Sequence, residues 1–140
     1  MRQVGLADRE AVQALLAQDP TVALAYAFSR AGRLPGPQEA GLQLGVFWRQ
    51  PQTGKALPPG ERTSHRLELE EQLATILGAE VDIVDLDTAS FPLRHRAARW
   101  GVCLKARPEA ELLRYRFEQF ARREEHRRRR FSRRPPPAKA

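Results

Sequence analysis

The sequence has 140 residues, of which 41% are hydrophobic and 29% charged, and it carries a formal net charge of +7. This length and apolar content exclude a disordered chain and favour one folded domain that buries about two-thirds of its unfolded surface. The single cysteine, Cys103, excludes an intrachain disulfide, and no apolar run is long enough to span a membrane. Because the first residues also lack the apolar core of a signal peptide, we expect a cytoplasmic protein without membrane contact.

The first part of the chain predicts a helix followed by two strands. Apolar residues recur at helical spacing over 6–19, and Pro20 ends this helix. The nearly continuous apolar run over 21–29 is typical of a strand that is covered on both faces. A loop over 30–40, rich in glycine and proline, leads to a strand over 41–48 with alternating leucines.

The rest of the chain predicts further helices and strands in alternation. After a turn-rich loop over 50–61, the expected elements are a helix over 61–78, a strand over 79–87, a helix over 90–101, a strand over 102–106 and a helix over 108–130. This order predicts an α/β (α+β) fold with a small mixed sheet of about four strands and helices packed on it. We expect a domain over 1–130 and a disordered, basic, Pro-rich tail over 131–140.

The positive charge is concentrated at the C-terminal end. Residues 114–140 contain eleven Lys+Arg and three Asp+Glu, whereas residues 1–113 contain thirteen and fourteen. This end is suited to the phosphates of a nucleic acid, to an acidic protein partner, or simply to solvent at a helix terminus whose dipole favours cations. The candidate binding residues are Arg127, Arg128, Arg129, Arg130, Arg133 and Arg134.

Four segments match one known family in spacing and residue type. They read YAFSRAGRL (26–34), EAGLQLGVF (39–47), EVDIVDLD (80–87) and RWGVCLKARPE (99–109). With them the chain resembles the minimal nucleotidyltransferases of the polymerase β-like superfamily, in which a first strand ends in F-G-S, a second carries S-D-x-D-L and a third carries V-D-L-V-D-L. The resemblance covers most of the predicted domain and implies a nucleotidyltransferase-like fold.

The resemblance also assigns positions to the chemistry of that family, in which divalent metals held by carboxylates act on a nucleoside triphosphate. It places Gly41 and Gln43 at the two D-x-D aspartates and Asp82 at the third carboxylate. Ser29 and Arg30 fall in the turn that binds nucleotide. One carboxylate in three does not make a two-metal site, so we expect a degenerate site without a bound cofactor.

Other interpretations of these residues stay open. Phe28 stands where the family has a small glycine, which crowds the approach to a phosphate. Ser29 also suits a turn-stabilising role at a strand end. Asp82 and Asp85 also suit structural roles, as helix caps or as partners of an arginine such as Arg94 or Arg96.

The family resemblance implies a leading hypothesis for function. Minimal nucleotidyltransferases of this size are antitoxins of HEPN-domain ribonucleases, which they inhibit by binding or by transferring AMP. We therefore expect a pseudoenzyme that neutralises a HEPN-type toxin in a complex, with the helix over 110–125 as a candidate contact surface. One alternative is an active enzyme that uses Mg and ATP for adenylyl transfer to a protein partner. Another is a nucleic-acid-binding protein that acts through its Arg-rich C-terminus.

Overall fold

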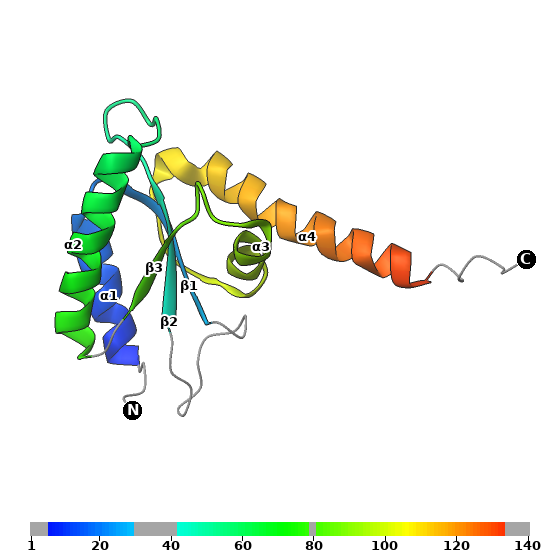
Figure 1. The fold of residues 1–140 in the computed structure, drawn as a ribbon, viewed down its shortest axis with the longest axis horizontal. Coiled ribbons are helices and arrows are strands. Elements are labelled where there is room, and N and C mark those ends of the chain that lie inside the picture. The colour runs from blue at the N-terminus through cyan, green and yellow to red at the C-terminus, as the bar shows by residue number, and fades with distance from the viewer. Residues whose placement is uncertain (1–5, 30–41, 79–80, 134–140) are drawn as a thin grey trace, which may run out of the picture.

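The computed structural model describes residues 6–29, 42–78 and 81–133. Figure 1 shows the elements in the predicted order of helices and strands. They are α1 (Leu6–Gln18), β1 (Val22–Ser29), β2 (Leu42–Trp48), α2 (Pro59–Leu77), β3 (Asp82–Asp85), α3 (Phe91–Trp100), β4 (Val102–Ala106), a short 3-10 turn (Pro108–Ala110) and α4 (Glu111–Arg133).

Two helices and one strand differ from the sequence prediction by more than one residue at an end. The strand predicted over 79–87 is the shorter β3, since residues 86–87 form a turn. Helix α2 begins at Pro59 rather than at residue 61, because proline at a first helical position loses no hydrogen bond. Its predicted stop at Gly78 is confirmed: Gly78 is left-handed, with φ 64°, and its N–H donates to the carbonyl of Ala74 over 2.9 Å. Helix α4 continues to Arg133, past the predicted end at residue 130, so the first residues of the predicted tail are helical.

The four strands form one mixed sheet in the order β3-β2-β1-β4. Strand β1 pairs antiparallel with both β2 and β4, whereas β2 and β3 are parallel. Helix α2 connects these two parallel strands, as a parallel pair requires. The predicted small mixed sheet is therefore confirmed, and the strand order that the sequence left open is now fixed.

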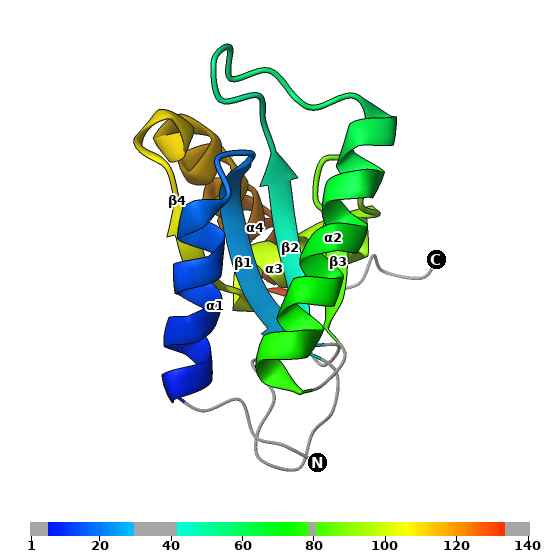
Figure 2. The ribbon, with the colours of Figure 1, turned by 90° about the vertical axis from the view of Figure 1, so that its left-hand side faces the viewer.

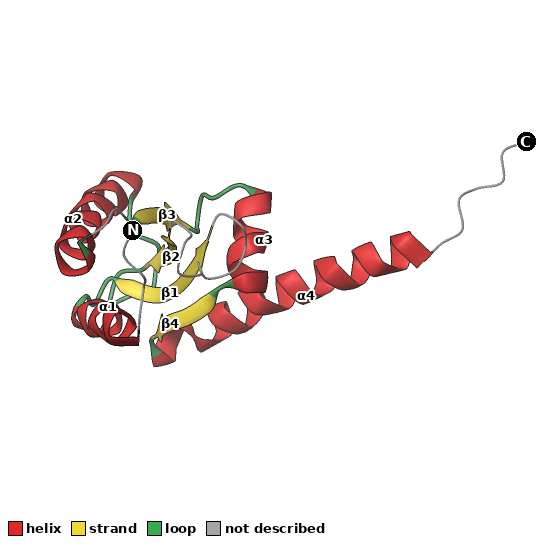
Figure 3. Ribbon diagram, turned by 90° about the horizontal axis from the view of Figure 1, so that it is seen from below, coloured by secondary structure: helices red, strands yellow, loops and turns green. Residues whose placement is uncertain are grey.

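The sheet lies between two helical layers. Figure 2 shows α1 and α2 side by side across the sheet, and Figure 3 shows α3 and α4 on the opposite face. On the first face, Leu16 of α1 and Leu73 of α2 join Trp48 of β2 in one buried cluster. On the second face, Phe117 of α4 lies 5.2 Å from the ring of Tyr26 and 5.1 Å from that of Phe47. Burial on both faces explains why β1 is almost entirely apolar.

Helix α4 has a packed first half and a projecting second half. Phe117 and Ala121 are buried against the sheet and α3, whereas His126 and the four residues that follow it are all exposed. Figures 1 and 3 show this second half extending well beyond the rest of the domain. Within the described ranges, no helix is long and apolar enough to cross a membrane.

Candidate functional site

Three side chains form a row where β1 ends and β2 and β3 begin. Gln43 of β2 is the register partner of Phe28 on β1 and of Asp82 on β3. Directly paired residues on neighbouring strands point to the same face of a sheet. Phe28 belongs to the core beneath α3 and α4, so all three side chains lie on that face. The fold thus brings together Gln43 and Asp82, which are 39 positions apart in the sequence.

Gln43 is the one buried polar side chain among the described residues, with 8% of its surface exposed. Its Oε1 atom is buried and accepts no hydrogen bond from any group that the structure describes. Phe28 beside it is completely buried, whereas Asp82 is exposed. A bulky ring and a neutral amide thus occupy two of the three positions in the row, and its carboxylate stands at the solvent-exposed edge.

Asp85, the second aspartate of β3, forms an ion pair within the fold. Asp85 Oδ2 lies 2.8 Å from Arg62 Nε of α2, and both side chains are largely buried. The suggested pairing of Asp85 with Arg94 is wrong: Arg94 donates instead to the carbonyl of Leu86, and its guanidinium lies over the ring of Phe47. Asp85 therefore links β3 to α2 on the face opposite to Gln43.

The described side chains do not fit a two-metal site. Magnesium prefers carboxylate and water oxygens, and a pair of ions needs several carboxylates in one place. In residues 6–29, 42–78 and 81–133, no group of three or more His, Cys, Asp or Glu side chains is placed to hold a metal. The possible oxygen ligands in the row of Phe28, Gln43 and Asp82 are the amide of Gln43 and the carboxylate of Asp82. Gly41 and Arg30 lie outside the described residues, and Ser29 is the last residue of β1.

The large apolar side chains of α4 form two groups, one packed and one exposed. Phe117 is buried, and the ring of Phe120 lies 5.2 Å from that of Phe91 on α3. Leu112 and Tyr115, by contrast, are 59% and 61% exposed. A helical residue turns by 100° from its neighbour, so Leu112 and Tyr115 face away from the sheet that Phe117 covers. These two residues are an apolar surface without a partner in the described part of the chain.

The contact between α3 and α4 also includes a partly buried histidine, His95. The ring of His95 stacks on that of Phe91, with 6.3 Å between their centroids. Burial, and next the positive charge of Arg128 on α4, lower the pKa of His95. The other two histidines, His65 and His126, lie on α2 and α4.

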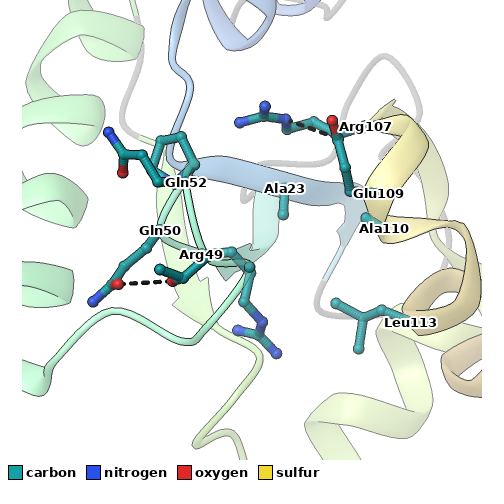
Figure 4. Close-up of a pocket in the computed structure, with 11 residues that line it drawn as sticks. Ala23, Arg49, Gln50, Gln52, Arg107, Glu109, Ala110 and Leu113 are labelled. Carbon is teal, nitrogen blue, oxygen red and sulfur yellow. Dashed lines mark hydrogen bonds and ion pairs between the residues drawn. The ribbon is translucent and has the colours of Figure 1, made fainter.

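A pocket of about 380 Å³ lies at the opposite end of the sheet from Gln43, between the start of β1, the loop after β2 and the start of α4 (Figure 4). Its charged groups already have partners. Arg49 is 2.8 Å from Asp87, and Arg107 is 3.4 Å from Glu109 and also donates to the carbonyl of Pro20. We therefore assign no ligand to this pocket.

Comparison with known proteins gives no sequence match but a clear match in fold. No protein-family model matches the chain, and no curated protein matches it. A chain of the toxin–antitoxin complex MntA-HepT has a TM-score of 0.56 and 21% identity, covering 91% of this chain and 95% of that one. A toxin–antitoxin structure with AMP-PNP gives a TM-score of 0.57 and 21% identity, with 90% and 95% covered.

A third similar structure comes from Shewanella oneidensis. It is a complex of an MNT antitoxin with a tri-AMPylated HEPN toxin, and the match has a TM-score of 0.51 and 19% identity, covering 88% of this chain and 94% of that one. At this level of identity the three matches establish a shared fold. The resemblance to minimal nucleotidyltransferases is therefore confirmed for the fold.

Proposed function

We propose that this chain is a catalytically degenerate nucleotidyltransferase-fold antitoxin, which binds a HEPN-type ribonuclease and neutralises it by forming a complex. The toxin–antitoxin context of the similar structures supports the partner class. The MntA-HepT match covers 91% of this chain and 95% of that chain, so the similarity is not confined to one part of the fold.

The burial of Gln43 beside Asp82 is the main observation that supports a degenerate site. The family resemblance requires a carboxylate at position 43, where it would share a metal with the neighbouring strand. The chain has instead a neutral amide, 8% exposed, next to the fully buried ring of Phe28. An amide oxygen carries no formal charge, so it offsets none of the positive charge of a magnesium ion.

The exposed pair Leu112 and Tyr115 is the contact surface that we assign to the toxin. Large apolar side chains in the first turns of a helix, outside the core, are typical of a protein–protein contact. Arg114 and Glu118, which lie 3.3 Å apart on the same helix, supply a polar rim beside them. Contact through this surface needs no catalysis, in agreement with neutralisation by binding.

Co-purification tests this proposal. The tagged chain is co-expressed with a HEPN-type ribonuclease from the same genome, and complex formation and RNA cleavage are measured. We expect a stable complex with suppressed cleavage, and loss of both effects in Leu112→Glu/Tyr115→Glu. The matched control is Leu67→Glu, which changes a residue 55% exposed on α2, in the other helical layer. Absence of a wild-type complex, or equal loss in the control, contradicts the proposal.

Adenylyl transfer to the toxin is the second candidate function, favoured by the AMP-PNP and the AMPylated toxin in two of the similar structures. Asp82 is then the remaining metal-binding carboxylate. Labelled ATP with magnesium distinguishes the two functions: transfer of label to the toxin that stops in Asp82→Asn supports the enzyme. Neutralisation without transfer of label supports the pseudoenzyme.

A further inference from the structure

The projecting half of α4 carries arginines around its whole circumference. Residues 127–130 are four consecutive arginines, all exposed. Successive residues in an α-helix are 100° apart, so these four side chains point in directions that together surround the helix axis. Arg122 and Arg123, one turn earlier, are exposed as well. This pattern differs from an amphipathic helix, which would gather its cations on one side.

Little of this charge is neutralised within the domain. Residues 122–130 contain six arginines and two glutamates. Arg127 pairs with Glu124 over 3.1 Å, and Glu125 is shared between Arg99 at 2.7 Å and Arg129 at 3.0 Å. In the part of the chain that the structure describes, the other four arginines of this segment make no ion pair: Arg122, Arg123, Arg128 and Arg130.

This arrangement disfavours the isolated helix and favours a polyanion. Like charges three or four residues apart, such as Arg123 with Arg127 and Arg127 with Arg130, repel each other on a helix. No side chain of residues 122–130 is buried to compensate. Glu125 pairs with Arg99 and Arg128 lies near His95 on α3, but the end of the segment projects beyond the body of the domain (Figures 1 and 3). An anionic ligand that surrounds the helix would relieve this repulsion on every side at once.

We infer that the projecting half of α4 binds duplex DNA by entering its major groove. An α-helix with its side chains is about 10–12 Å across, and the major groove of B-DNA is about 12 Å wide. Phosphates line both walls of that groove, so arginines on opposite sides of one helix can each contact a phosphate. The projection of the helix lets it enter the groove while the body of the domain stays outside.

Two other polyanions fit these observations less well. The major groove of A-form RNA is too narrow for side chains to enter, so an RNA duplex would contact one side of the helix. An acidic protein surface would likewise meet one side and leave the remaining arginines in solvent. Binding of duplex DNA is a separate function from neutralisation of a toxin, which uses Leu112 and Tyr115 in the packed half of the helix.

Fluorescence anisotropy of a labelled, random-sequence DNA duplex tests the inference, with an RNA duplex of the same sequence and poly-glutamate as competitors. The test variant changes Arg122, Arg123, Arg128 and Arg130 to glutamine, a good helix former that removes only charge. We expect the wild type to bind DNA, with affinity that falls steeply as salt is raised. The variant should bind at least about tenfold more weakly and with a salt slope reduced by up to about 3.6, or about 0.9 for each phosphate contact.

A variant that removes two charges from the body of the domain, Arg9→Gln/Lys55→Gln, shows whether net charge alone accounts for DNA binding. The matched variant removes two charges from the projecting half of α4, Arg128→Gln/Arg130→Gln. We expect the body variant to bind as the wild type does and the matched variant to bind more weakly, with a slope reduced by about 1.8. Absence of DNA binding, equal loss in the body variant, or equal competition by RNA or poly-glutamate would overturn the inference.

Discussion

Gln43 and Asp82 are register partners on the parallel strands β2 and β3, and the amide of Gln43 is buried where the family resemblance places a carboxylate. The cost of burying each side chain favours a glutamine over an aspartate at this position. A buried aspartate at position 43 would need a cation to offset its charge, whereas a glutamine is neutral and tolerates burial at a smaller cost. The burial of a neutral side chain here supports the proposed loss of the metal site.

Removing the polar group of Gln43 should stabilise the protein. Its Oε1 is buried without a donor in the described structure, and such a group costs about 1–3 kcal/mol. Gln43→Met keeps the length of the side chain and should raise the free energy of unfolding by about 1 kcal/mol in urea titrations. Gln72→Met, at an exposed position of α2, is the control and should change little. A loss of stability in Gln43→Met would show that the amide has a stabilising partner.

The packing of β2 against the turn after β3 is tested at Gly45. A Cβ atom at this position would come within 2.8 Å of the Leu86 side chain, which is fully buried. Gly45→Ala should therefore destabilise the protein by about 1–3 kcal/mol. Gly60→Ala, where an added Cβ meets nothing within 4 Å, should be neutral or stabilising by up to about 1 kcal/mol. Thermal or urea unfolding of the two variants measures the difference, and equal stability would contradict the placement of β2 against Leu86.

The seam between α3 and α4 should respond to pH through His95. Burial and Arg128 lower the pKa of His95, so the unfolded chain binds its proton more readily than the folded one. The free energy of unfolding should therefore fall as the pH drops through the ordinary pKa of histidine, about 6.5, towards the lower folded value. His95→Gln should remove part of that decrease.

The contribution of Arg128 to this pKa can be measured directly. Arg128→Gln removes the nearby positive charge, so the pKa of His95 in an NMR titration should rise. Arg123→Gln on the same helix is the control, because the main groups that shift the pKa of His95 include Arg128 but not Arg123. An unchanged pKa in Arg128→Gln would contradict the packing of α4 along α3.

The sequence predicted most elements because its apolar patterns are strong where both faces of the sheet are covered. It did not predict the division of α4, since periodicity alone does not distinguish Phe117, which meets the sheet, from Tyr115, which meets solvent. Nor did it predict the end of that helix, because a run of arginines has no apolar period to follow. The pairing of Asp85 with Arg62 depends on how α2 crosses the sheet, a relation between elements that local pattern does not contain.

The candidate site was predictable to the extent that family spacing places its positions. The resemblance placed Gln43 and Asp82 on the second and third strands, and the structure adds that these strands are neighbours and that the two residues are direct register partners. The burial of Gln43 and its unpaired oxygen were not foreseen, because they arise from Phe28 and the helices above it.

Calorimetry of ATP binding in the presence of magnesium tests the central claim, the loss of the metal site, most directly. The wild type is compared with Gly41→Asp/Gln43→Asp, and Gly41→Asn/Gln43→Asn serves as a control of similar size without charge. We predict no binding by the wild type or the control, and magnesium-dependent binding by the aspartate variant. Binding of ATP by the wild type that disappears when magnesium is chelated would contradict the account and establish a working metal site.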